Sequence, residues 1–160
     1  MDPIVARAMA RWPNVPAVYG WLALDRRGNW LLRSTGATQQ FERITNRALR
    51  EFIARNYESD STGRWYFQNG PQRVYVTLAY TPLVVHYEGE ALLDHCGRPF
   101  APGAVYQDDE GSVLMQGPGV VALLDDRDLL RFADSEHTLE PIRREEVARR
   151  FGFIAEPQPG

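Results

Sequence analysis

Apolar and polar residues alternate through the segment GRWYFQNGPQRVYVTL, which runs from Gly63 to Leu78. Alternation with a period of two indicates half-buried strands, and the central Asn-Gly-Pro sequence favours a turn between them. By position parity, a loop of two residues and a loop of four both place the same apolar residues on one face. These residues are Trp65, Phe67, Val74, Val76 and Leu78. We expect this face to pack in the core.

The opposite face of the same hairpin carries arginine and tyrosine side chains. Four of them are candidate ligand-binding residues: Arg64, Tyr66, Arg73 and Tyr75. In the simplest interpretation, cross-strand tyrosine and arginine pairs only cover the sheet, each contributing about 0.2–1 kcal/mol. Alternatively, a cleft over this face holds a small anionic ligand, or a peptide, on the two arginines. A third interpretation is stacking on single-stranded nucleic acid, which normally needs a basic surround.

Helical periodicity is strongest in the segment ITNRALREFIARNY, at Leu49, Phe52, Ile53 and Tyr57. This spacing predicts one long amphipathic helix over about residues 45–57, capped by Thr45 or Asn46. Terminal helices are expected from Pro3 onward and from Pro141 to Phe151, where Gly152 can end the helix. The last six residues, AEPQPG, are expected to fray.

The pattern Asp-x-x-Gly occurs four times, beginning at Asp25, Asp60, Asp94 and Asp108. Asp accepts hydrogen bonds from the backbone that follows it, and Gly supplies the positive φ that closes such a turn. These turns predict an α+β fold of antiparallel, hairpin-rich sheets with one long amphipathic helix and terminal helices. We expect a single compact domain over residues 1–160, or two small halves at about 17–88 and 89–135 with helical termini.

The order of the segments LDRRGNWLL, ITNRALREFI, DSTGRWYFQNGPQRVYV and TPLVV resembles a proteobacterial family known only as a domain of unknown function. The resemblance covers roughly residues 19–116 and rests on the turn and aromatic pattern. It implies an unusual α+β fold made of two small hairpin-plus-helix repeats. It also implies a role in signalling or ligand sensing.

Composition and charge narrow the classes of function. The chain has 160 residues, a formal net charge of −3 and 24% charged residues, so we expect neither a nucleic-acid partner nor an anionic membrane surface. We see no apolar run long enough to span a bilayer and no signal peptide. Cys96 is the single cysteine, which excludes an intramolecular disulfide and favours a cytoplasmic location. All 18 basic residues are arginine, which excludes a Schiff-base lysine and a Walker-type phosphate loop.

A second candidate group surrounds the cysteine. Asp94, His95 and Cys96 are consecutive, and His86 lies on the preceding predicted strand. Adjacent residues in a strand or turn usually point apart, which favours an Asx-type turn with an exposed histidine and a half-buried thiol. The alternative is a metal site at these four residues, although their spacing matches no usual zinc motif, or a Cys-His dyad.

The leading hypothesis is a non-enzymatic cytoplasmic protein, without a cofactor, that binds a small molecule or a protein partner, with a role in signalling. The sequence contains no nucleophile elbow, phosphate loop or dinucleotide fingerprint. One alternative is a small hydrolase or metal-dependent enzyme that uses His86, His95 and Cys96. Another is a structural or assembly subunit, which predicts a stable homodimer.

Overall fold

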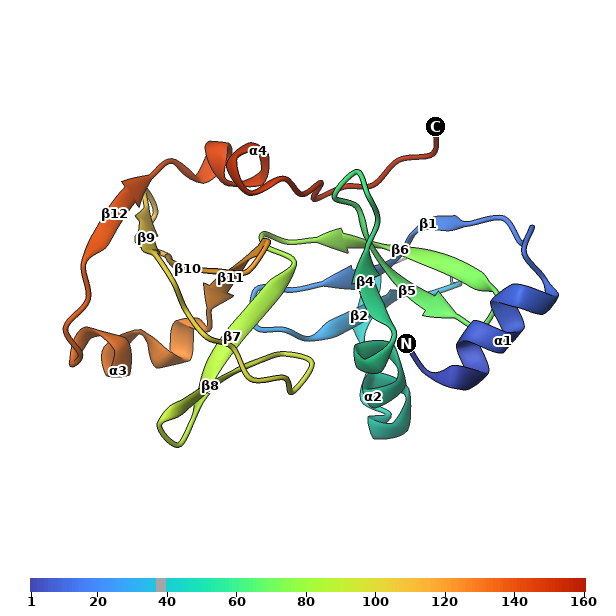
Figure 1. The fold of residues 1–160 in the computed structure, drawn as a ribbon, viewed down its shortest axis with the longest axis horizontal. Coiled ribbons are helices and arrows are strands. Elements are labelled where there is room, and N and C mark those ends of the chain that lie inside the picture. The colour runs from blue at the N-terminus through green and yellow to red at the C-terminus, as the bar shows by residue number, and fades with distance from the viewer. Residues whose placement is uncertain (37–39) are drawn as a thin grey trace. The chain divides into compact units, whose positions relative to one another are not determined.

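The computed structural model describes residues 1–36 and 40–160, and the chain divides into two compact units. Unit 1 comprises Met1–Asp25, Asn29–Ala79 and Ile154–Gly160, and unit 2 comprises Arg26–Gly28 and Tyr80–Phe153. Each unit contains one six-stranded sheet with both parallel and antiparallel pairs, whose strands are labelled in Figure 1. The fold is therefore α+β, with two mixed sheets and four short α-helices among the described residues.

Unit 1 begins with a helix and contains the predicted hairpin. Its elements are α1 (Pro3–Arg11), β1 (Val18–Leu24), β2 (Trp30–Arg33), β3 (Phe41–Arg43), α2 (Arg47–Arg55), β4 (Tyr57–Ser59), β5 (Trp65–Asn69) and β6 (Gln72–Leu78). The strand order in the sheet is β3-β2-β1-β6-β5-β4. β1 and β6 pair in parallel, and the other neighbours pair antiparallel.

Unit 2 has shorter helices and a second sheet. Its elements are β7 (Leu83–Glu88), β8 (Ala91–Asp94), β9 (Val105–Asp108), β10 (Val113–Gly117), β11 (Val120–Leu124), the 3₁₀ turn η1 (Asp126–Asp128), α3 (Leu129–Ala133), β12 (Leu139–Ile142), the 3₁₀ turn η2 (Arg144–Glu146) and α4 (Val147–Phe151). The strand order is β12-β9-β10-β11-β7-β8. β11 pairs in parallel with β7, and β12 pairs in parallel with β9.

Five strands of each sheet share one topology. The order β2-β1-β6-β5-β4 in unit 1 corresponds to β8-β7-β11-β10-β9 in unit 2, and each pair has the same direction. The turns Asp60–Gly63 and Asp108–Gly111 occupy equivalent places, before β5 and before β10. The helix α2 has no counterpart in the described residues between β8 and β9. The strands are therefore repeated, and the helix is not.

The predicted hairpin is confirmed by the pairing of β5 with β6. Phe67 lies opposite Val74, and Tyr66 lies opposite Tyr75, so the two faces separate as parity requires. Phe67 and Val76 are buried in the core. The loop contains Gly70 at φ +57 followed by Pro71, which suits a tight turn.

The predicted long helix is wrong, because α2 has nine residues and ends at Arg55. Its start is as expected, since the Asn46 side chain accepts a hydrogen bond from the Leu49 amide at 2.9 Å. Tyr57, which matched the helical spacing, belongs instead to β4 and pairs with Phe67. Its side chain is 1% exposed. Burial in the sheet therefore overrides the helical pattern at this end.

Three other expectations change at the level of elements. The sheets are mixed rather than antiparallel, because turn sequences specify hairpins and not the pairing of distant strands. Pro141 lies in β12, so the last helix is only α4, which ends at Gly152 in the left-handed region as expected. The tail does not fray at Pro157, which is buried in unit 1.

Candidate functional site

The structure brings the four predicted residues of the hairpin face together, and we call Arg64, Tyr66, Arg73 and Tyr75 the tyrosine–arginine cluster. The Arg73 guanidinium lies 3.9 Å from the Tyr66 ring centroid. The Arg64 guanidinium lies 4.5 Å from the Tyr75 centroid. Both contacts have the geometry of cation–π interactions.

Two residues that the sequence did not indicate complete the cluster. Tyr19 from β1 stacks on Tyr75, with ring centroids 4.8 Å apart. Asp60 accepts a hydrogen bond from the Tyr75 hydroxyl at 2.9 Å and another from Arg64 Nε at 2.9 Å. The Asp-x-x-Gly pattern indicated Asp60 only as a turn residue. Tyr19 carries no local signal, because its place follows from the parallel pairing of β1 with β6.

Burial limits what the tyrosine–arginine cluster can bind. Tyr66 and Tyr75 are 5% and 3% exposed, so their rings do not form an open stacking platform. Burial disfavours ionisation of Asp60, but hydrogen bonds from Thr62, Arg64 and Tyr75 outweigh it and hold the pKa of the carboxyl well below its usual range. The two arginines remain partly exposed, and ligand binding by this face stays a prediction.

The four residues of the predicted cysteine group have separate roles. Asp94 accepts backbone hydrogen bonds from Cys96 and Arg98, as the turn interpretation requires. Burial raises the pKa of the Cys96 thiol to about 12, so the sulfur is protonated at neutral pH. Within residues 1–36 and 40–160, no three His, Cys, Asp or Glu side chains gather as a potential metal site. His86 and His95, however, line the same pocket in unit 2.

This pocket, which we call the histidine–arginine pocket, has a volume of about 330 Å³. Its polar lining comes from the β1–β2 turn, β7, the turn after β8 and η1: Arg27, His86, His95, Asp125, Arg127 and Asp128. These segments are far apart in the sequence, so only the tertiary structure brings two arginines and two histidines together. Sequence reasoning named the two histidines and missed the arginines.

A close backbone approach places Arg27 at the pocket. The next residue, Gly28, has φ +82, and a Cβ at this position would lie 2.6 Å from the His95 Cβ. Only glycine fits both conditions. The Val84 amide donates to His95 Nδ1 at 3.2 Å, so a neutral His95 ring carries its proton on Nε2. The turn, β7 and His95 are thereby packed against one another within unit 2.

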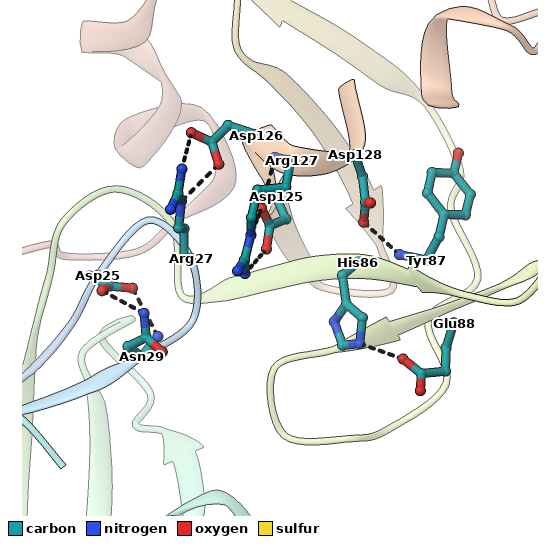
Figure 2. A network of polar contacts seen from close by, with 10 residues as sticks. All are labelled: Asp25, Arg27, Asn29, His86, Tyr87, Glu88, Asp125, Asp126, Arg127 and Asp128. Carbon is teal, nitrogen blue, oxygen red and sulfur yellow. Dashed lines mark hydrogen bonds and ion pairs between the residues drawn. The ribbon is translucent and has the colours of Figure 1, made fainter. Parts of the chain in front are cut away.

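Each arginine of the pocket is paired with an aspartate, as Figure 2 shows. Arg127 donates to both carboxylate oxygens of Asp125, at 3.0 and 2.6 Å, and its amide donates to Asp125 Oδ1. Burial opposes ionisation of Asp125, but the hydrogen bonds from Arg127 lower its pKa. Arg27 donates from Nε and Nη2 to the two oxygens of Asp126, at 2.9 and 3.2 Å.

Two larger pockets of unit 2 are lined by side chains that are less suited to binding a specific polar ligand. One, of about 600 Å³, is lined mainly by apolar groups such as Leu92, Pro99 and Phe100. The other, of about 460 Å³, lies along β12 beside Ile142 and Arg150. The histidine–arginine pocket is smaller, but its lining includes two arginines and two histidines, and polar side chains of this kind can fix the orientation of a ligand. We therefore take it as the main candidate site.

Comparison with known proteins places the chain in a family. A family model described as "Protein of unknown function (DUF2946)" matches residues 1–158. The chain belongs to this family. The expected relation to a family of unknown function is thus confirmed, and the family description assigns no activity. No curated protein matches the chain.

Two solved structures are similar to this DUF2946 family member. A DUF1285 family protein from Silicibacter pomeroyi DSS-3 has a TM-score of 0.53 and 18% sequence identity, and the match covers 84% of each chain. A DUF1285 family protein from Shewanella baltica OS155 has a TM-score of 0.49 and 12% identity, with 71% of this chain and 90% of that chain covered. The first likeness shows a shared fold alone.

In the described part of the chain, no helix is both long and apolar enough to cross a membrane.

Proposed function

We propose that the protein is a non-enzymatic binding protein for a small molecule with an anionic group, and that the ligand binds in the histidine–arginine pocket. The observation that carries the proposal is that Arg27, Arg127, His86 and His95 line one pocket. Guanidinium and imidazole N–H groups are strong donors to carboxylate and phosphate oxygens. A role in signalling belongs to the same proposal, since a protein that binds such a ligand without converting it can report its concentration.

The size of the pocket limits the ligand. Pockets that bind small molecules usually measure about 300–1,000 Å³, and this one, of about 330 Å³, lies at the lower end. A compact metabolite therefore fits the volume better than a long chain or a folded partner. The tyrosine–arginine cluster remains the alternative binding face of the same protein.

The alternative of a hydrolase or metal-dependent enzyme at His86, His95 and Cys96 has less support from the contacts of this region. A nucleophilic cysteine acts as a thiolate, and the raised pKa of Cys96 keeps its thiol protonated at neutral pH. Asp94 is engaged by the amides of its own turn. His86 contacts Glu88, with 3.2 Å between His86 Nε2 and Glu88 Oε2. These contacts favour binding over acid–base or nucleophilic chemistry at this position.

Thermal-shift and calorimetric titrations with inorganic phosphate, succinate and citrate test the proposal. At least one of these anions should stabilise the wild-type protein, and Arg27→Ala should weaken its binding by about tenfold or more, because a bidentate charge-assisted hydrogen bond is lost. Arg47→Ala is the matched control. Arg47 is an exposed arginine of α2 whose partner is Glu51, outside the pocket.

The outcome also decides between the two sites. If binding is unchanged in Arg27→Ala and lost in Arg73→Ala, the ligand binds at the tyrosine–arginine cluster and the pocket is excluded. If putrescine stabilises the protein and no anion does, the anionic class is wrong.

A further inference from the structure

Both arginines that line the histidine–arginine pocket are paired with an aspartate, but only Asp125 lines the pocket as well, and the two pairs differ in how firmly the arginine is held. Asp125 has a side chain only 5% exposed, and it accepts hydrogen bonds from the Arg127 side chain and amide. Breaking this pair would leave a buried carboxylate without its cation, which is strongly unfavourable. Arg127 is therefore fixed to its aspartate.

The Arg27–Asp126 pair lies in water. The two side chains are 50% and 61% exposed, so solvent and salt screen their attraction. Asp126 lies within η1, and its carboxylate is not needed to fill the core. An exposed pair of this kind exchanges its acceptor readily when another anion of suitable shape is present. Exchange of the Arg27–Asp126 ion pair thus costs less than exchange of the Arg127–Asp125 pair.

The geometry of the exposed pair shows what such a ligand must offer. Arg27 uses the Nε and Nη2 edge of its guanidinium, with one carboxylate oxygen on each nitrogen at 2.9 and 3.2 Å. This two-point arrangement is the one that guanidinium groups use to bind carboxylates and phosphates. The Asp126 carboxylate therefore binds the same edge of the Arg27 guanidinium that a ligand's carboxylate or phosphate group would use.

We propose that Asp126 is an internal competitor, whose carboxylate binds the Nε and Nη2 edge of the Arg27 guanidinium until a ligand's carboxylate or phosphate group replaces it. This inference rests on the proposed function and deepens it in two ways. It assigns the ligand to the bidentate oxyanions. It also makes Arg27 the arginine that changes partner on binding, while Arg127 keeps Asp125.

The inference is tested by ¹⁵N NMR titration of the full chain with inorganic phosphate and with succinate. The probe is the Arg27 Nε–Hε signal, identified by its loss in Arg27→Lys. In Asp126→Asn this signal should shift without ligand, and the protein should bind the anion about twofold to fivefold more tightly, the factor that an exposed competing ion pair supplies. Arg27→Lys in the Asp126→Asn protein keeps the positive charge but cannot make the two-point hydrogen bond of a guanidinium, so it should remove the gain in anion affinity.

Glu51→Gln is the matched control, because it removes one negative charge from an exposed ion pair of α2, outside the pocket. An equal gain in Glu51→Gln and Asp126→Asn would reduce the effect to net charge and overturn the inference. If the wild type binds the anion and Asp126→Asn binds it with the same affinity, the inference is overturned and the proposed function still stands. Absence of binding in the wild type and in every variant would overturn both. Asp126→Ala provides a second removal of the carboxylate if Asp126→Asn unfolds.

Discussion

Single aspartates have two kinds of partner in this protein, one local and one distant. Asp60 and Asp108 each accept a hydrogen bond from an amide of their own turn, that of Thr62 and that of Glu110 respectively. Each also accepts a hydrogen bond from a tyrosine hydroxyl far along the chain, at 2.9 Å from Tyr75 and at 2.7 Å from Tyr80. The two units thus use equivalent turns in the same way. The turn pattern predicts the first set of bonds, and only the tertiary fold supplies the second.

The Asp60 contacts predict a pH-dependent contribution to stability. Its pKa in the folded protein lies below the value of about 3.9 expected for an unfolded chain, so its contribution is fully present above that value and is lost as the pH falls toward the folded pKa. Asp60→Asn should lower the free energy of unfolding by about 1–3 kcal/mol at pH 7. Urea unfolding of both proteins between pH 7 and pH 3 measures this. The difference should shrink below about pH 4, and a constant difference would contradict the assignment.

Among the elements, the C-terminal segment Ile154–Gly160 is an integral part of unit 1. The Ile154 amide donates to the Gly63 carbonyl at 2.9 Å, and the Leu78 amide donates to the Ala155 carbonyl at 2.8 Å. Arg64 Nη1 donates to the Gln158 carbonyl at 3.3 Å. These contacts satisfy backbone groups at the ends of two strands. The segment follows unit 2 in the sequence but completes unit 1.

Removal of Ile154–Gly160 should therefore destabilise the protein by about 2–4 kcal/mol, from two backbone hydrogen bonds and the buried Pro157 ring. Thermal or urea unfolding measures the change. Removal of only the last two residues, which are exposed, is the control and should change stability by less than about 0.5 kcal/mol. Equal stability of the longer truncation and the intact chain would show that the segment does not hold unit 1 together.

At the scale of the whole molecule, net charge opposes the use of the tyrosine–arginine cluster as a nucleic-acid site. The formal charge of −3 gives no general attraction to a polyanion, and the two tyrosine rings are buried. We expect no saturable binding of a fluorescent oligothymidine at about 50 mM salt with protein up to about 100 µM. Fluorescence anisotropy measures it. Salt-sensitive binding that is lost in Arg73→Ala and kept in Arg47→Ala would contradict this expectation.

Local sequence is enough to predict four features: the β5–β6 hairpin with its two faces, the Asp-x-x-Gly turns, the start of α2 at Asn46 and the end of α4 at Gly152. Each depends on residues a few positions apart, whose turn chemistry and parity act before any tertiary contact exists. The histidines of the pocket were also named from the sequence, but for a different site.

Long-range packing sets the parallel strand pairs, the early end of α2 and the composition of both candidate sites. The β1–β6 pairing places Tyr19 on Tyr75, and the approach of Gly28 to His95 places Arg27 beside the two histidines. Such contacts join residues that are dozens of positions apart. They follow from which strands pair and pack best over the whole chain, and that choice leaves no periodic signal in any single segment.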